Sequence, residues 1–221
     1  MEFIQSTRSK DQISTAAIDA FMSRFFFRKE YGQHEIVTDR ERQLKGIDVI
    51  VGNMNIDCKA MSAPGYINNP VPTFAQEIWS YSSNTNCYYE GWFINQNLET
   101  THYMYIWIPE ADVPKGGYIT DSRQIKRLEV MIVDSTALHN MIYGYANRER
   151  IRDYGWRMIE RKINEKVVLP EFSSLRGLAP WFRRSGQLQE GPVNLIIPKK
   201  LLQNCAVRHC MVTAQGVTDL I

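Results

Sequence analysis

The sequence has no long hydrophobic run, and this absence excludes one class of protein. None of its apolar stretches approaches the roughly 20 residues that a membrane-spanning helix needs. Residues 1–10 are polar and lack the apolar segment of a secretory signal peptide. Internal repeats and low-complexity tracts are also absent. We therefore expect a soluble cytoplasmic protein with no membrane partner.

Cysteine is scarce as well. Four cysteines in 221 residues do not form the disulfide framework of a small secreted domain. Cys205, His209 and Cys210 suggest zinc, but an adjacent Cys and His rarely chelate one ion well, and the sequence has no second pair. Reduced, unpaired cysteines are the expectation.

No Pro- or Gly-rich linker divides the chain. Its 44% hydrophobic and 23% charged residues are ordinary for a globular protein, and the length allows a large core without cross-links. We predict a single domain over residues 1–221. Within it, residues 10–146 form the core, and residues 147–221 form a basic C-terminal extension. Homo-oligomers remain possible.

The net charge of +2 hides an uneven distribution. Residues 1–146 contain 13 Lys and Arg against 17 Asp and Glu, whereas residues 147–221 contain 13 against 7. A basic segment of this kind can hold a phosphate backbone. A helix over 148–166 that is simply solvated and ion-paired explains the same pattern, and both interpretations stay open.

Hydrophobic periodicity and turn residues predict the elements. Helices are expected over residues 10–31, 73–81, 135–145 and 148–166, with a short one opening at Pro198. Strands are expected over residues 34–38, 47–51, 56–60, 92–94, 102–108 (ended by Pro109), 128–133 and 193–197.

Two acids and a lysine stand out within this pattern. Asp48 lies in the apolar run 46–51, and nine residues later Asp57-Cys58-Lys59 lies in the run 56–60. Gly52-Asn53 supplies hairpin chemistry between them. Strand residues alternate faces, so Asp57 and Lys59 point the same way. A tight hairpin places Asp48 beside them, and crowded carboxylates favour a cation such as Mg²⁺.

This constellation resembles the PD-(D/E)XK nuclease superfamily over residues 39–60, with a plausible extent of about 10–135. In that pattern one Asp ends a hairpin strand and the next strand carries (D/E)-x-K. The proline is absent here, because Ile47 precedes Asp48. The resemblance implies an α/β fold. Its restriction-endonuclease-like αβββαβ core has a mixed central sheet flanked by helices, here with the C-terminal extension added.

The resemblance also implies a function, the metal-dependent hydrolysis of phosphodiester bonds in nucleic acid, with DNA as the expected partner. Asp48 and Asp57 would bind Mg²⁺ or Mn²⁺, and the backbone carbonyl of Cys58 would offer a third oxygen. Lys59 would position or help to deprotonate the attacking water and offset phosphate charge. The alternative is a catalytically silent module on the same fold that binds nucleic acid or protein.

Further acids are candidates for the site. Many family members carry one on the first helix, and Asp19 fits that layout better than Asp11. Glu77, on the helix expected over 73–81, shares a face with Phe74 and Tyr81 and is a further catalytic candidate. An ordinary acid near a helix N-terminus explains Glu77 equally well.

Substrate contacts are expected from one amide and four arginines. Gln43 precedes the strand of Asp48 and is a candidate, although a surface role fits it as well. Arg157, Arg161, Arg183 and Arg184 are candidates for phosphate contacts. Trp181 beside the paired arginines can stack on bases, and a buried aromatic is the alternative.

Overall fold

The computed structural model of the protein describes residues 7–185 and 191–220, with side chains from residue 12 onward. It is an α/β protein that divides into two compact units, each built from separate stretches of chain. The first unit comprises Met1–Val71, Glu99–Asp134 and Ala206–Ile221, and the second comprises Pro72–Leu98 and Ser135–Cys205. No helix in the described part of the chain is long and apolar enough to cross a membrane.

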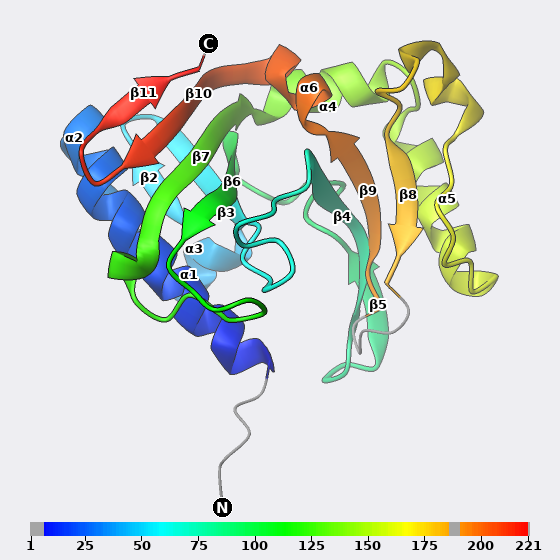
Figure 1. Ribbon diagram of the computed structural model, residues 1–221. Coiled ribbons are helices and arrows are strands. Elements are labelled where there is room, and N and C mark those ends of the chain that lie inside the picture. The colour runs from blue at the N-terminus through cyan, green and yellow to red at the C-terminus, as the bar shows by residue number, and fades with distance from the viewer. Residues whose placement is uncertain (1–6, 186–190, 221) are drawn as a thin grey trace, which may run out of the picture. The chain divides into compact units, whose positions relative to one another are not determined.

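The first unit contains a mixed sheet, as expected. It has seven strands in the order β1-β2-β3-β6-β7-β10-β11 (Figure 1). Its strands are β1 (Glu35–Ile36), β2 (Val49–Val51), β3 (Met54–Ala60), β6 (His102–Ala111), β7 (Ile125–Asp134), β10 (Ala206–Thr213) and β11 (Val217–Asp219). β3 and β6 pair in parallel, and the other neighbours pair antiparallel.

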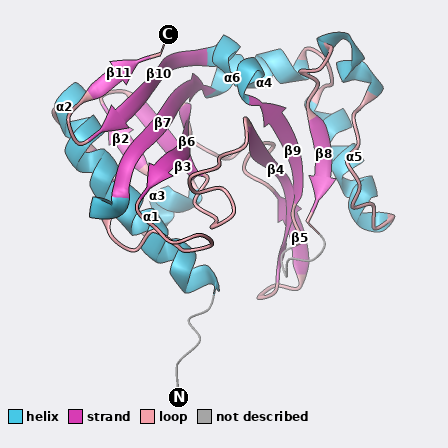
Figure 2. Ribbon diagram, viewed as in Figure 1, coloured by secondary structure: helices cyan, strands magenta, loops and turns pink. Residues whose placement is uncertain are grey.

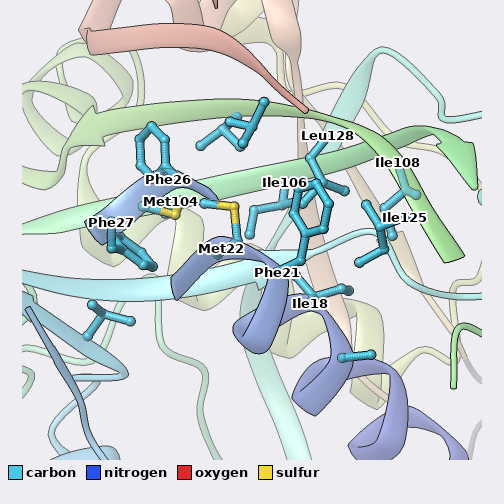
Figure 3. Close-up of a cluster of buried hydrophobic side chains, with 14 of the residues drawn as sticks. Ile18, Phe21, Met22, Phe26, Phe27, Met104, Ile106, Ile108, Ile125 and Leu128 are labelled. Atoms are coloured by element: carbon cyan, nitrogen blue, oxygen red, sulfur yellow. The ribbon is translucent and has the colours of Figure 1, made fainter. Parts of the chain in front are cut away.

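The helix expected over residues 10–31 is present and covers one face of this sheet. It comprises α1 (Thr7–Met22), a π-helical turn (Ser23–Phe27) and α2 (Arg28–Glu30). Ile18, Phe21 and Met22 pack onto β6 and β7 in a buried hydrophobic cluster (Figure 3). The spacing of these residues gives the helix a continuous apolar stripe, which fixes its rotation. The other helical segments of the unit are α3 (Arg40–Leu44) and a 3₁₀ turn (Ser122–Gln124).

The second unit contains an antiparallel four-stranded sheet in the order β5-β4-β9-β8. Its strands are β4 (Thr73–Ser82), β5 (Cys87–Glu90), β8 (Trp181–Arg184) and β9 (Val193–Pro198). Its helical segments are α4 (Ser135–Tyr143), α5 (Arg148–Glu160), α6 (Lys199–Leu202) and 3₁₀ turns at Pro170–Leu175 and Gln203–Cys205. α5 covers one face of the sheet (Figure 2), where Trp79 Nε1 donates to the carbonyl of Arg152 at 2.9 Å.

The prediction of a helix over residues 73–81 is wrong, because this segment is strand β4. Phe74, Gln76, Ile78 and Ser80 are all buried, which is the two-residue period of a strand. The helix that the αβββαβ order places after the hairpin is therefore replaced here by a strand of the second unit.

Other sequence expectations need smaller corrections. Residues 92–94 form a turn, not a strand, since the amide of Ile94 donates to the carbonyl of Gly91. Pro109 does not end its strand, because β6 continues to Ala111 across an irregularity in its pairing with β7. The helix expected to reach residue 166 ends at Glu160. The strands expected over 128–133 and 193–197 and the helix over 135–145 are present.

Candidate functional site

The β2–β3 hairpin brings Asp48 against β3. Val51 pairs with Met54 across the two-residue turn at Gly52-Asn53, and Gly52 has a positive φ of 57°, which favours glycine. The amide of Asp48 donates to the carbonyl of Ile56 at 2.9 Å. Oδ2 of Asp48 accepts from the amide of Cys58 at 2.9 Å. Both bonds hold the carboxylate beside the strand that carries the second acid.

Alternation along β3 separates apolar from charged residues. Ile56 and Cys58 pack with the hydrophobic cluster on the α1 side, so Asp57 and Lys59 point to the opposite face. Lys59 Nζ donates to Asp57 Oδ1 at 2.5 Å. The Asp57 side chain is only 4% exposed and that of Lys59 is 26% exposed. The hairpin thus brings the Asp48 carboxylate to a buried ion pair, as the sequence predicts.

The Asp57 carboxyl stays protonated to a much higher pH than an ordinary aspartate does. Burial is the largest cause, and Asp48 adds charge repulsion and a hydrogen bond to the protonated carboxyl; Lys59 opposes them. The net effect raises the pKa of Asp57 to about 7. The Asp57 carboxyl is therefore largely protonated below about pH 7, because burial and a neighbouring carboxylate both disfavour its charged form.

Lys59 remains a cation in this setting. Burial lowers the pKa of its ammonium, but the nearby Asp57 and Asp48 carboxylates outweigh burial, and the pKa lies above its ordinary value. Lys59 thus supplies positive charge rather than a free base at neutral pH.

The first helix contributes a third acid. Burial and then the charge of Asp48 raise the pKa of Asp19 to about 6, which places its carboxyl within electrostatic reach of Asp48. The thiol of Cys58 lies among the same groups. Burial first, then Asp48, Asp19 and Asp57, raise its pKa well above 9, so the thiol stays protonated. The side chain of Asp11, the other candidate on this helix, lies outside the described residues.

Glu77 lies on a strand and not on the expected helix, whereas Gln43 is exposed, as the surface interpretation expects. Glu77 belongs to β4 of the second unit, where its backbone carbonyl accepts from the amide of Phe93 at 3.1 Å. Gln43 lies on α3 of the first unit, and its Nε2 donates to the carbonyl of Val37 at 3.1 Å. This bond ties α3 to the chain that follows β1.

The four arginine candidates all belong to the second unit but come from two elements. Arg157 lies on α5 and Arg161 caps its end, and both are exposed. Arg183 and Arg184 lie on β8 and point to opposite faces, so Arg183 is exposed and Arg184 is half-buried. The Nε of Arg184 is buried without a hydrogen-bond partner among the described residues.

The described residues offer few candidate metal ligands. The described residues hold no group of three or more His, Cys, Asp or Glu side chains suited to a metal ion. Cys205 belongs to the second unit and Cys210 to the first, and both are buried. The candidate ligands from the sequence, Asp48 and Asp57, are two carboxyls that interact directly.

The arrangement consists of three acids and a lysine from one helix and one hairpin, and the pKa values of two of the acids, Asp19 and Asp57, are raised. The hairpin order and the alternation along β3 indicated three of these residues, and only the layout of the resembled family suggested Asp19. The hydrogen bond from the amide of Cys58 to Asp48 had no sequence signal beyond the hairpin register. In comparisons with known proteins, no family model, no curated protein and no solved structure matches the chain.

Proposed function

We propose that the first unit hydrolyses phosphodiester bonds in nucleic acid, with DNA as the expected substrate and Mg²⁺ or Mn²⁺ as the cofactor. One observation carries the proposal: Asp48, Asp57 and Lys59 converge on a β-hairpin in the order of the PD-(D/E)XK pattern. The flanking α1 and the mixed sheet are compatible with a restriction-endonuclease-like core.

The donor set fits a hard divalent cation. Mg²⁺ in enzymes of this kind is bound by one or two carboxylates together with waters and substrate phosphate. Asp48 and Asp57 supply two carboxyl groups, and a cation would displace the proton that Asp57 holds near neutral pH. We assign them as the ligands, with the carbonyl of Cys58 as a third oxygen. The metal would polarise the phosphoryl oxygen and acidify a bound water.

Lys59 acts through its charge. Its raised pKa keeps it protonated at neutral pH, and its hydrogen bond to Asp57 fixes the ammonium beside the proposed ligands. An ammonium held in this position stabilises negative charge as it develops on the phosphoryl group. Asp19 adds a third carboxyl group near the site, and the charge of Asp48 helps to raise its pKa.

One contact favours a second function, binding of nucleic acid without cleavage. Lys59 Nζ already bonds Oδ1 of Asp57, one of the oxygens that a metal would use. If this ion pair persists, the site holds an internal cation in place of Mg²⁺.

The test is a cleavage assay of the whole chain on plasmid, linear and single-stranded DNA and on RNA, with Mg²⁺, Mn²⁺ or EDTA. We expect cleavage that needs the divalent ion and is lost in Asp57→Asn. Glu41→Gln makes the same chemical change at an 85% exposed side chain and should cleave normally. Metal-independent binding with no cleavage of any substrate would support the second function, and neither binding nor cleavage would reject both.

A further inference from the structure

The first unit contains a cavity that the proposed chemistry does not use. It has a volume of about 420 Å³ and lies between the loop that follows β3 and the loop that follows β6. β3 and β6 are parallel neighbours, so both loops leave the same edge of the sheet (Figure 1). Ligands in open α/β sheets bind outside the carboxyl ends of parallel strands, which is where this cavity lies.

Hydrogen bonds hold the cavity open. Asn68, in the first loop, has a positive φ of 64° and makes a pair of side-chain bonds to the backbone of Ala111 at the end of β6. Its own amide donates to the carbonyl of Ile108 at 2.9 Å. In the second loop the amide of Gly117 donates to the carbonyl of Pro114 at 2.8 Å. Hydrogen bonds within the protein therefore hold both loops that line the cavity, and no ligand is needed to fix them.

The walls combine flat apolar surface with polar groups. Pro64, Ile67 and Pro114 supply the apolar surface. The exposed side chains of Asn69 and Lys115 add an amide and an ammonium. An amide both donates and accepts, as the edge of a nucleobase requires, and an ammonium suits a phosphate. The volume falls within the range of small-ligand pockets, roughly 300–1,000 Å³.

The cavity is also close in sequence to the catalytic candidates. Pro64 follows Lys59 by five residues, which span at most roughly 17 Å when fully extended. Stacked nucleotides are spaced about 3.4 Å apart along one strand. A nucleotide within about five positions of the scissile phosphate can therefore reach the cavity.

We propose that this cavity binds one nucleotide of the substrate strand, with its base unstacked between the proline walls and its phosphate on Lys115. The inference rests on the proposed function and deepens it, because a site for an unstacked base selects single-stranded or frayed nucleic acid.

Gly65 offers a direct test, because it lines the cavity and a Cβ built there meets nothing within 4 Å. Gly65→Phe should fill the cavity without a backbone clash. Gly216→Phe is the matched control, since a Cβ at Gly216 is equally open and Gly216 does not line the cavity.

Binding of a single-stranded oligodeoxynucleotide containing 2-aminopurine is measured by fluorescence in EDTA. We expect binding to weaken by about tenfold in Gly65→Phe and to stay unchanged in the control. Lys115→Glu repeats the test if Gly65→Phe does not fold.

The outcomes separate this inference from the proposed function. Cleavage by the wild type together with unchanged binding by Gly65→Phe and Lys115→Glu would overturn the nucleotide site and leave the nuclease intact. Oligonucleotide binding that is lost in Gly65→Phe, in a protein that never cleaves, would support the site and reject the nuclease. If deoxyadenosine monophosphate occupies the cavity while oligonucleotide binding ignores Gly65→Phe, the cavity serves a free nucleotide and the inference is wrong.

Discussion

Asp57 makes the folded protein sensitive to pH, because the carboxyl is nearly enclosed beside another acid. Its pKa is about 7 in the folded state, against an ordinary value of 3.8 for an aspartate in the unfolded chain. The folded state therefore binds more protons than the unfolded chain between these values. The stabilisation is complete below about pH 4 and is lost as pH rises through about 7. Three pKa units correspond to about 4 kcal/mol, as an order of magnitude.

We therefore predict that Asp57→Asn removes most of this pH dependence. Without divalent ions, the variant should match or exceed the wild type in unfolding free energy at pH 8 and lose that advantage near pH 4. Urea unfolding at intervals from pH 4 to 8 measures the difference. Parallel curves for the two proteins would show that Asp57 titrates normally in the folded state.

Metal binding should release the proton that Asp57 holds near neutral pH. Because Mg²⁺ requires ionised carboxylates, its binding below pH 7 should release a proton, up to about one per ion for a group with this pKa. Calorimetry in two buffers of different ionisation enthalpy measures the release. Asp57→Asn, which has no such proton, is the comparison. Binding in the wild type without proton release would place the ion elsewhere.

The site was predictable from sequence wherever local rules determine positions. The alternation of Asp57 and Lys59 and the turn at Gly52 need no tertiary information, and together they bring Asp48 to β3. Asp19 could be offered only as one of two acids, because its reach toward Asp48 depends on how the helix packs on the sheet.

At the scale of elements, β4 shows why a short apolar pattern is ambiguous. Phe74 and Ile78 are four residues apart, and residues four apart share a face in a helix and also in a strand. The buried Gln76 and Ser80 between and after them complete the strand period, but both are polar and give no hydrophobic signal. The sheet partners of β4 decide the structure, and β9 lies more than 100 residues away in sequence.

The bend after β5 depends on a glycine that nothing larger can replace. A Cβ on Gly91 would lie 2.4 Å from the backbone oxygen of Glu77, at the irregularity in β4. We predict that Gly91→Ala destabilises the second unit by about 1–3 kcal/mol or more, because the clash is with backbone. Thermal unfolding measures the loss. Gly65→Ala, with open space around its Cβ, should unfold like the wild type; an equal loss in both variants would argue against a steric cause.

At the scale of the whole molecule, the last segment was the hardest to predict. Residues 206–213 leave the second unit and form β10, which pairs with β7 about 75 residues earlier in the sequence. The segment alternates, with Cys210 and Val212 in the core of the first unit, but only a partner strand fixes where such a segment goes. The residues after 147 are therefore shared between the two units.

The division into units also redistributes the charge. The sequence gives the second unit 12 Lys and Arg against 8 Asp and Glu, and the first unit 14 against 16. Part of the basic excess is engaged in ion pairs, such as Arg148 with Glu90 and Arg150 with Glu171. Arg157 and Arg161 are exposed, and no ion pair of theirs is found among the described residues. These two arginines are therefore the best test of a phosphate contact.

We predict that the double variant Arg157→Glu/Arg161→Glu binds nucleic acid more weakly and with a smaller salt dependence. Each phosphate contact releases condensed counterions, so losing two should reduce the slope of log affinity against log salt by about 1.8 for duplex DNA. Titrations in EDTA at several salt concentrations measure the slope.

The control Arg123→Glu/Lys126→Glu reverses two exposed charges of the first unit, with side chains 88% and 52% exposed. Both variants change the net charge of the chain equally, so a general electrostatic effect would lower both slopes alike. A smaller slope only for the α5 variant would assign phosphate contacts to the end of that helix. Unchanged affinity and slope there would assign its basic residues to solubility or to a protein partner.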